Sequence, residues 1–131
     1  MPYLLDSDWI INALARRPHT VSTLDRLASQ GISVSLITVG EIYEGAFGFA
    51  DPSAHLSAFR RFLQPYHVLG LNDPIMERFA ELRHLLRRHG QMIPDLDLLL
   101  GATALHYDLT VLTSNSRHLG RIPGLKLYRP A

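Results

Sequence analysis

Residues 93–115 read IPDLDLLLGATALHYDLTVLTSN, and this stretch decides the fold class. Pro94 followed by Asp95 is typical of a helix N-terminus. The residues from Leu98 to Leu105 are apolar nearly all round, which predicts a helix buried on every side. Thr110–Leu112 then predicts a strand, which is followed by a polar turn. A buried helix leading into a strand is the unit from which α/β sheets are built.

The rest of the chain repeats this alternation of short β-type runs with helical patterns. Strands are predicted at 3–6, 32–37, 66–69 and 110–112, with a short fifth at 126–128, and helices at 8–17, at 20–30, after Thr38 as N-cap, from Pro52, from Asp73 to Gly90, and from Pro94 onward. The pattern predicts one α/β domain over residues 1–131. Its core would be a central, mostly parallel sheet of four to five strands flanked by helices.

The amino-acid composition excludes several kinds of catalytic and metal site. The 131 residues are 47% hydrophobic and contain no cysteine, which excludes disulfides, thiolate zinc sites and a cysteine nucleophile. The formal net charge is +1 and therefore does not by itself indicate nucleic-acid binding. The N-terminus carries a carboxylate at Asp6 instead of a basic segment, and no apolar run approaches the ~20 residues of a membrane span. A cytoplasmic protein without a membrane segment is expected.

Polar side chains follow the predicted strands at the edge where α/β proteins bind ligands. Asp6 ends the first strand, Glu41 lies one helical turn past the second, and Asn115 follows the fourth. Asp97 lies in the first turn of the buried helix. Three carboxylates in one cleft would repel each other unless a cation neutralised them, and hard Mg²⁺ or Mn²⁺ suits such oxygen ligands. Metal-assisted phosphodiester hydrolysis is the chemistry that fits.

Each of these residues also has a plain structural interpretation. Asp6 or Asp8 could cap the first helix. Glu41 and Glu44 could form a solvated face. Asp95, directly after Pro94, is the more natural helix cap, which leaves Asp97 as the ligand.

Other catalytic patterns are absent from the sequence. The seven histidines form no His-Glu-x-x-His motif, so they are interpreted as surface or core residues. No serine lies in a Gly-x-Ser-x-Gly elbow, and there is no phosphate-binding Gly-x-x-x-x-Gly-Lys loop. The aromatic residues Phe47, Phe49, Phe59 and Phe62 are candidates for a partner surface, although Phe59 and Phe62 could equally belong to the core.

Three ordered segments resemble the PIN-domain family. They are Leu4-Leu5-Asp6-Ser7-Asp8, Thr38-Val39-Gly40-Glu41-Ile42-Tyr43-Glu44-Gly45, and the long stretch from Ile93 through Asp97 to Ala104. The closing run 109–119 with 122–125 is similar to the VapC-like toxin branch, whose members belong to toxin-antitoxin pairs. The resemblance spans nearly the whole chain.

The resemblance implies a single PIN-like domain with Asp6, Glu41 and Asp97 as ligands of Mg²⁺ or Mn²⁺. Asn115 falls where many relatives carry a fourth Asp, which implies contact with a metal only through water. Ser7 and Thr113 would orient the carboxylates. The implied activity is endoribonuclease action on single-stranded or loop RNA. The implied partners are the RNA substrate, a cognate antitoxin protein and a second copy in a homodimer.

Two rival functions stay open on sequence alone. Asp6-Ser7-Asp8 after an apolar strand also resembles the nucleophile and acid of haloacid-dehalogenase-like phosphohydrolases. That family needs a lysine near the phosphate, and the only lysine here is Lys126, so this rival is disfavoured. The second rival, suggested by Asn115, is a degenerate PIN domain that binds RNA or protein without cutting.

Overall fold

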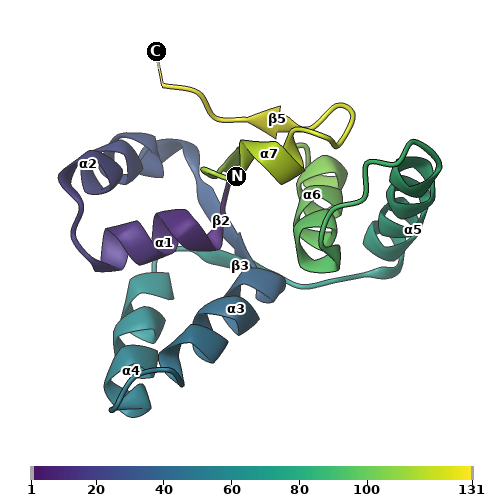
Figure 1. The fold of residues 1–131 in the computed structure, drawn as a ribbon. Helices are drawn as coiled ribbons and strands as arrows, with labels where there is room; N and C mark the ends of the chain where they lie inside the picture. The colour runs from purple at the N-terminus through teal and green to yellow at the C-terminus, as the bar shows by residue number, and fades with distance from the viewer. Residues whose placement is uncertain (1, 131) are drawn as a thin grey trace.

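A single five-stranded sheet organises the chain in the computed structural model, which describes residues 2–130 (Figure 1). The strand order is β3-β2-β1-β4-β5, and every neighbouring pair is parallel. The strands are β1 (Tyr3–Leu5), β2 (Ile32–Ser35), β3 (His67–Leu69), β4 (Thr110–Leu112) and β5 (Lys126–Leu127). The helices are α1 (Ser7–Leu14), α2 (Pro18–Leu27), α3 (Leu36–Ala46), α4 (Pro52–Leu63), α5 (Asp73–Arg88), α6 (Asp95–Tyr107) and α7 (Ser116–Leu119), with a 3-10 turn at Ala28–Gln30. The predicted α/β class is confirmed.

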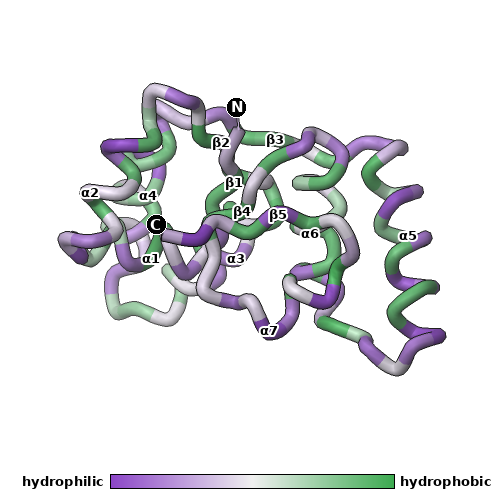
Figure 2. The backbone as a smooth tube through the Cα atoms, turned by 90° about the horizontal axis from the view of Figure 1, so that it is seen from above, coloured by the Kyte–Doolittle hydropathy of each residue, from purple (hydrophilic) through white to green (hydrophobic). Residues whose placement is uncertain are grey.

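Helices cover both faces of the sheet. In Figures 1 and 2, α5 and α6 lie on one side of the strands while α1, α2 and α4 lie on the other. Successive residues of β1 point to opposite faces. Leu4 joins the core under α5 and α6, whereas Leu5 joins the core under α1 to α4. The sheet therefore separates two apolar clusters.

Helix α6 is buried, as its all-round apolar pattern predicts. Leu98, Ala102 and Ala104 are fully buried, and Leu100 is nearly so. Gly101 packs against the side chain of Ile122, so closely that a Cβ at this position would clash with it. This contact holds α6 against the segment that follows α7.

Several predicted boundaries are wrong by a few residues. Strand β2 ends at Ser35 and not at residue 37, and Ser35 caps α3 in place of Thr38, with its Oγ accepting from the backbone N of Ile37 at 3.1 Å. The reason is that pairing of β2 with β3 stops at Ser35, which leaves the following residues without a strand partner. Helix α2 begins at Pro18, because proline suits the first helical turn.

Two further differences concern the neighbours of the candidate site. The first helix is shorter than predicted and begins at Ser7, with Asp6 as its N-cap. The polar turn after β4 continues into α7, which the sequence did not predict, and Asn115 caps it. None of the helices within residues 2–130 is both long and apolar enough to cross a bilayer.

Candidate active site

The candidate residues meet where β2, β1 and β4 end. These three strands are adjacent and parallel, so the segments that leave them emerge at the same edge of the sheet. Asp6 directly follows β1, Glu41 lies on the helix that follows β2, and Asn115 lies three residues past β4. Asp97 reaches this edge from the first turn of α6.

Asp6 is both a helix cap and a buried acid. Only 5% of the surface of Asp6 is exposed to solvent. Oδ1 accepts from the backbone N of Ser7 at 2.7 Å, while Oδ2 accepts from the Thr113 hydroxyl at 2.7 Å. Because each oxygen serves a different neighbour, capping does not prevent a role in the site.

A chain of hydrogen bonds connects Asp6 to Asp97. The Thr113 hydroxyl that donates to Asp6 also accepts from the backbone N of Asn115 at 2.9 Å. The side-chain amide of Asn115 then donates to Oδ2 of Asp97 at 3.1 Å. The turn after β4 therefore ties together two acids that lie far apart in sequence.

The orientation of the Asn115 amide follows from its two neighbours. Its Oδ1 accepts from the backbone N of His118 at 3.4 Å, which is the cap of α7. A carboxylate can only accept, so the nitrogen of the amide must face Asp97. Asn115 therefore presents a donor to the site and acts on Asp97. Its predicted water-mediated contact with a metal stays a prediction.

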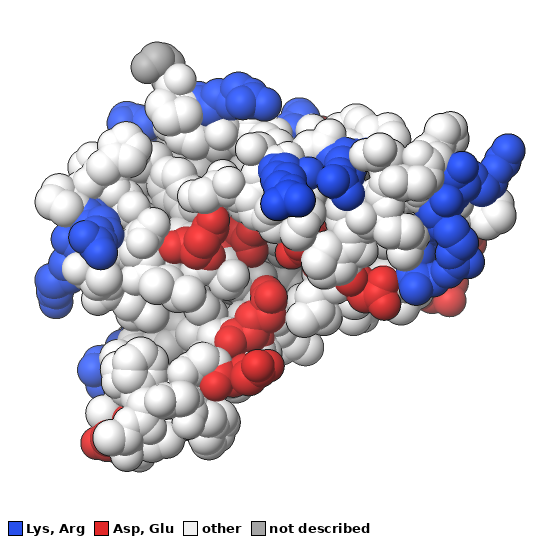
Figure 3. Space-filling model, in the orientation of Figure 1, with Lys and Arg blue, Asp and Glu red and all other residues white. Residues whose placement is uncertain are grey.

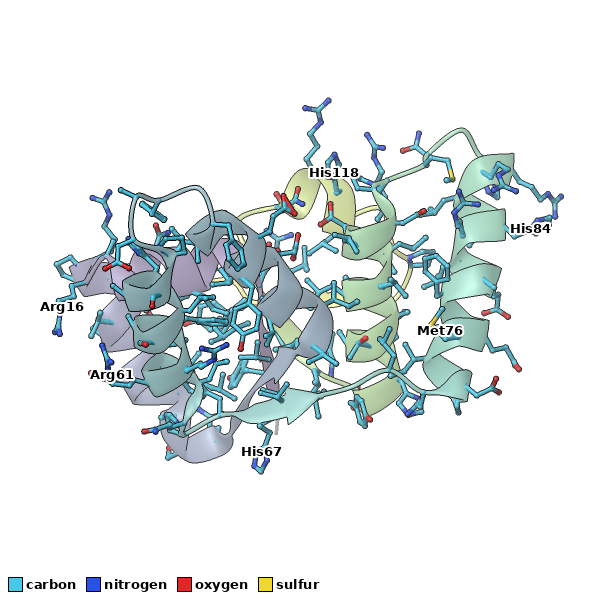
Figure 4. The ribbon with its side chains drawn as sticks, turned by 90° about the horizontal axis from the view of Figure 1, so that it is seen from below. Arg16, Arg61, His67, Met76, His84 and His118 are labelled. Atoms are coloured by element: carbon cyan, nitrogen blue, oxygen red, sulfur yellow. The ribbon has the colours of Figure 1, made fainter. Side chains whose placement is uncertain are left out.

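His118 is the site residue that the sequence interpretation missed. Its Nδ1 lies 2.9 Å from Oδ2 of Asp97 and donates to it, because a carboxylate oxygen offers no proton. In Figure 4, His118 lies on α7 at the end of the molecule opposite His67, and His84 lies on the outer helix α5. The spacing of Asn115 and His118 is the signal that could have found it, since residues three apart lie on the same side of a helix.

Electrostatics couple Glu41 to the same site. Burial raises the pKa of the Glu41 carboxyl, and the charges of Asp6, Asp97 and Glu44 raise it further. Burial also raises the pKa of Asp6, against the hydrogen bonds from Thr113 and Ser7 that lower it. Repulsion from Asp8 and Asp97 adds to the rise at Asp6. Asp97 therefore lies near enough to raise the pKa of both Asp6 and Glu41.

The acidic side chains are neighbours, but they do not form a complete metal-coordination site. Among residues 2–130, no three or more His, Asp or Glu side chains are grouped closely enough to hold a metal ion directly. The donor set nevertheless fits a hard cation, since it consists of desolvated carboxylates that repel one another. Mg²⁺ is usually bound through one or two carboxylates and several waters. The arrangement suits such partly water-mediated binding.

Asp8 and Asp95 have structural partners instead. Asp8 accepts from the backbone N of Trp9 at 2.8 Å and from that of Ser114 at 2.8 Å, which fixes the turn after β4 against α1. Asp95 was predicted to cap α6, and this is wrong: the cap residue is Pro94, with no side-chain hydrogen bond. Asp95 pairs with Arg83 of α5 at 2.9 Å, because its side chain points outward from the helix start.

A largely apolar groove adjoins the acids. It has a volume of about 780 Å³ and is lined by α1, α3 and α4. Glu41 and Glu44 lie on its wall, and Phe49 and the buried Phe59 contribute to its apolar surface. Phe47 is exposed but does not line the groove. Figure 3 shows acidic side chains gathered in the hollow at the centre of this face, with most basic side chains toward its rim.

Comparison with known proteins identifies the family. Residues 3–125 match the PIN domain. The chain belongs to the PIN-domain family. Among curated relatives, this PIN domain is 27% identical over 128 residues to Ribonuclease VapC1 of Haemophilus influenzae (strain R2866), a match that covers 96% of each chain. It is 24% identical over 127 residues to the tRNA(fMet)-specific endonuclease VapC of Salmonella typhimurium, covering 97% of this chain and 96% of that one.

Solved structures agree with this assignment. The PIN domain superimposes on a chain of the VapBC2 crystal structure from Rickettsia felis, bound to a promoter DNA fragment, with a TM-score of 0.92. The match covers 100% of both chains at 26% identity. VapBC-1 from nontypeable Haemophilus influenzae gives a TM-score of 0.86 at 26% identity, covering 98% of this chain and 97% of that one. The predicted relation to VapC-like toxins is confirmed.

Proposed function

We propose that this PIN domain is a divalent-metal-dependent endoribonuclease, the toxin of a toxin-antitoxin pair. The observation that carries the proposal is the connected acidic site: Asp6 is linked through Thr113 and Asn115 to Asp97, and Glu41 shares their electrostatic field. Relatives matched along almost their whole length are named as a ribonuclease and as a tRNA(fMet)-specific endonuclease.

Asp6, Glu41 and Asp97 are the proposed ligands of Mg²⁺ or Mn²⁺. When bound, such a cation lowers the pKa of a water and stabilises the charge that develops on the phosphate. The protein itself orients the carboxylates through hydrogen bonds. Thr113 and the backbone of Ser7 orient Asp6, and Asn115 donates a hydrogen bond to Asp97 in the first turn of α6.

The proposed substrate is single-stranded or loop RNA. A flexible strand can bring a phosphate into a site built at the edge of a sheet, whereas a duplex holds its backbone in a fixed path. Arg117 lies exposed on α7 beside His118, at the rim of the site. Its guanidinium is proposed to hold a phosphate of the RNA, for which the planar fork of arginine is well suited.

The proposed occupant of the apolar groove is a helical segment of the antitoxin. An amphipathic helix would bury its apolar side against Phe49 and Phe59, and a basic side chain at its end would meet Glu41 and Glu44. Matched relatives in solved structures are VapBC toxin-antitoxin complexes. The homodimer expected from the family resemblance stays a prediction.

The haloacid-dehalogenase alternative is not favoured. Lys126, the only lysine, lies on the edge strand β5, and its amine pairs with Asp108 at 2.8 Å. Asp8, the acid that this alternative requires, uses its oxygens to accept from backbone N–H groups. The match of residues 3–125 to the PIN domain also favours the nuclease.

The test is cleavage of a labelled, structured RNA by the purified protein with Mn²⁺. Wild type is compared with Asp97→Asn and with wild type plus a chelator. Asp95→Asn is the matched control, because Asp95 lies two residues away but pairs with Arg83 at the surface. We expect cleavage by wild type and Asp95→Asn only. Cleavage that survives both Asp97→Asn and the chelator would refute the proposed site, and RNA binding without cleavage would favour the degenerate PIN domain.

A further inference from the structure

Two side-chain donors restrain Asp97, one of the proposed ligands. Its Oδ2 accepts from His118 Nδ1 at 2.9 Å and from Asn115 Nδ2 at 3.1 Å. One donor is the N-cap of α7 and the other lies within this short helix, and both bonds converge on one oxygen. The side chains are well covered, with 18% of Asp97 and 31% of His118 exposed. This arrangement fixes the rotation of the carboxylate.

We propose that His118 is a positioning residue that holds Asp97 for the divalent cation, an inference that rests on the proposed function. By occupying Oδ2, His118 aims the other carboxylate oxygen at the site. An oriented carboxylate loses less conformational freedom when a cation binds than one that must first be ordered. Partners that orient a metal ligand typically change metal affinity by about 10- to 100-fold when removed.

The surroundings of α7 support a positioning role. Leu119, next to His118, is fully buried in the core shared with α6. At the end of α7, Arg121 Nη1 donates to the carbonyl oxygen of Met92 at 2.9 Å, just before α6 begins. The short helix is therefore anchored to the N-terminal end of α6 at two points, and the imidazole is held in place relative to Asp97.

The choice of ring nitrogen separates positioning from direct metal binding. His118 uses Nδ1 on Asp97, so a cation bound by this ring would have to use Nε2 or displace the contact. Asparagine can place its amide nitrogen near the position of Nδ1, whereas glutamine reaches toward the position of Nε2. Substitution by each amide therefore distinguishes the two roles.

The experiment measures Mn²⁺ binding to the full chain by electron paramagnetic resonance, for wild type, His118→Ala, His118→Asn and His118→Gln. His84→Ala is the matched control, because His84 is exposed on α5. We expect His118→Ala and His118→Gln to weaken binding by about 10- to 100-fold, and His118→Asn to restore most of the affinity. Thermal melting of each variant shows that it is folded. With RNA as substrate, kcat should fall in His118→Ala while KM changes little, since His118 acts through Asp97.

Several results would overturn the proposal. Wild-type affinity in folded His118→Ala would show that the contact does not position Asp97. Rescue by His118→Gln but not by His118→Asn would make His118 a direct ligand through Nε2. In both cases loss of binding in Asp97→Asn would leave the proposed function intact. If wild type itself binds no Mn²⁺, the proposed function and this inference fail together.

Discussion

Replacing Thr113 by valine removes the hydroxyl that joins Asp6 to the turn after β4. Valine keeps the shape of threonine, so the change deletes two hydrogen bonds with little change in packing. One is the donation to Oδ2 of Asp6 at 2.7 Å, and the other is the acceptance from the backbone N of Asn115 at 2.9 Å. The variant therefore isolates the energetic role of this link.

The magnitude follows from the two bonds. A hydrogen bond to a charged, buried carboxylate contributes about 1.5–3 kcal/mol, and a neutral one about 1 kcal/mol. Thr113 is only half-buried, so water replaces part of the loss, and the expected cost is about 2 kcal/mol. For a domain of this size, that lowers Tm by about 6–10 °C.

The pH dependence has a definite sign. Burial raises the folded-state pKa of Asp6, and the Thr113 bond opposes that rise. Without the hydroxyl, the pKa of Asp6 in the folded state rises further. A raised folded-state pKa stabilises the fold at low pH, and this stabilisation is lost as the pH rises through it. The deficit of Thr113→Val relative to wild type is therefore largest near neutral pH and shrinks on acidification.

Urea denaturation at about pH 7.5 and about pH 5 measures this difference. Thr113→Ser is the control, because it keeps the hydroxyl and should retain most of the stability. An equal loss at both pH values, or a serine variant as unstable as the valine variant, would refute the reasoning.

Three other perturbations test separate parts of the site. Glu41→Gln should be at least as stable as wild type near neutral pH, because burial and neighbouring charges raise the pKa of Glu41. This advantage should vanish on acidification. Thermal melts at both pH values check this, with Glu77→Gln, at an exposed position on α5, as the control. Phe49→Asp should weaken binding of the cognate antitoxin by about 10-fold or more while Phe47→Asp leaves it unchanged, measured by calorimetry. Equal loss in both variants would contradict the groove as docking site. Arg117→Ala should reduce the salt dependence of RNA binding, lowering the slope of log K against log salt by about 0.7, and an unchanged slope would remove Arg117 from the phosphate contacts.

The fold was largely predictable because its signals are local. The all-round apolar pattern of α6 and the β-branched runs of the strands depend on neighbouring residues only. The start of α3 was not predictable, since Ser35 and Thr38 offer the same capping chemistry. The choice between them depends on where β2 stops pairing with β3, which is a contact between distant segments.

The site was partly predictable for the same reason. Asp6 and Glu41 stand out because they follow apolar strands of an α/β sheet, and Asp97 stands out because it opens a helix that is otherwise apolar. His118 does not stand out, because its partner Asp97 is 21 residues away and belongs to a different helix. The outward direction of Asp95 depended likewise on Arg83 of α5. The roles of His118 and Asp95 could not be predicted because each depends on a contact with another helix.

Calorimetric titration of Mn²⁺ into wild type, Asp6→Asn, Glu41→Gln and Asp97→Asn tests most directly whether three distant acids share one cation. We expect each of the three substitutions to lower the affinity for Mn²⁺. Asp95→Asn, titrated as the control, should bind Mn²⁺ as tightly as wild type. Mn²⁺ binding that is unchanged in all three variants would contradict the shared site and with it the nuclease mechanism.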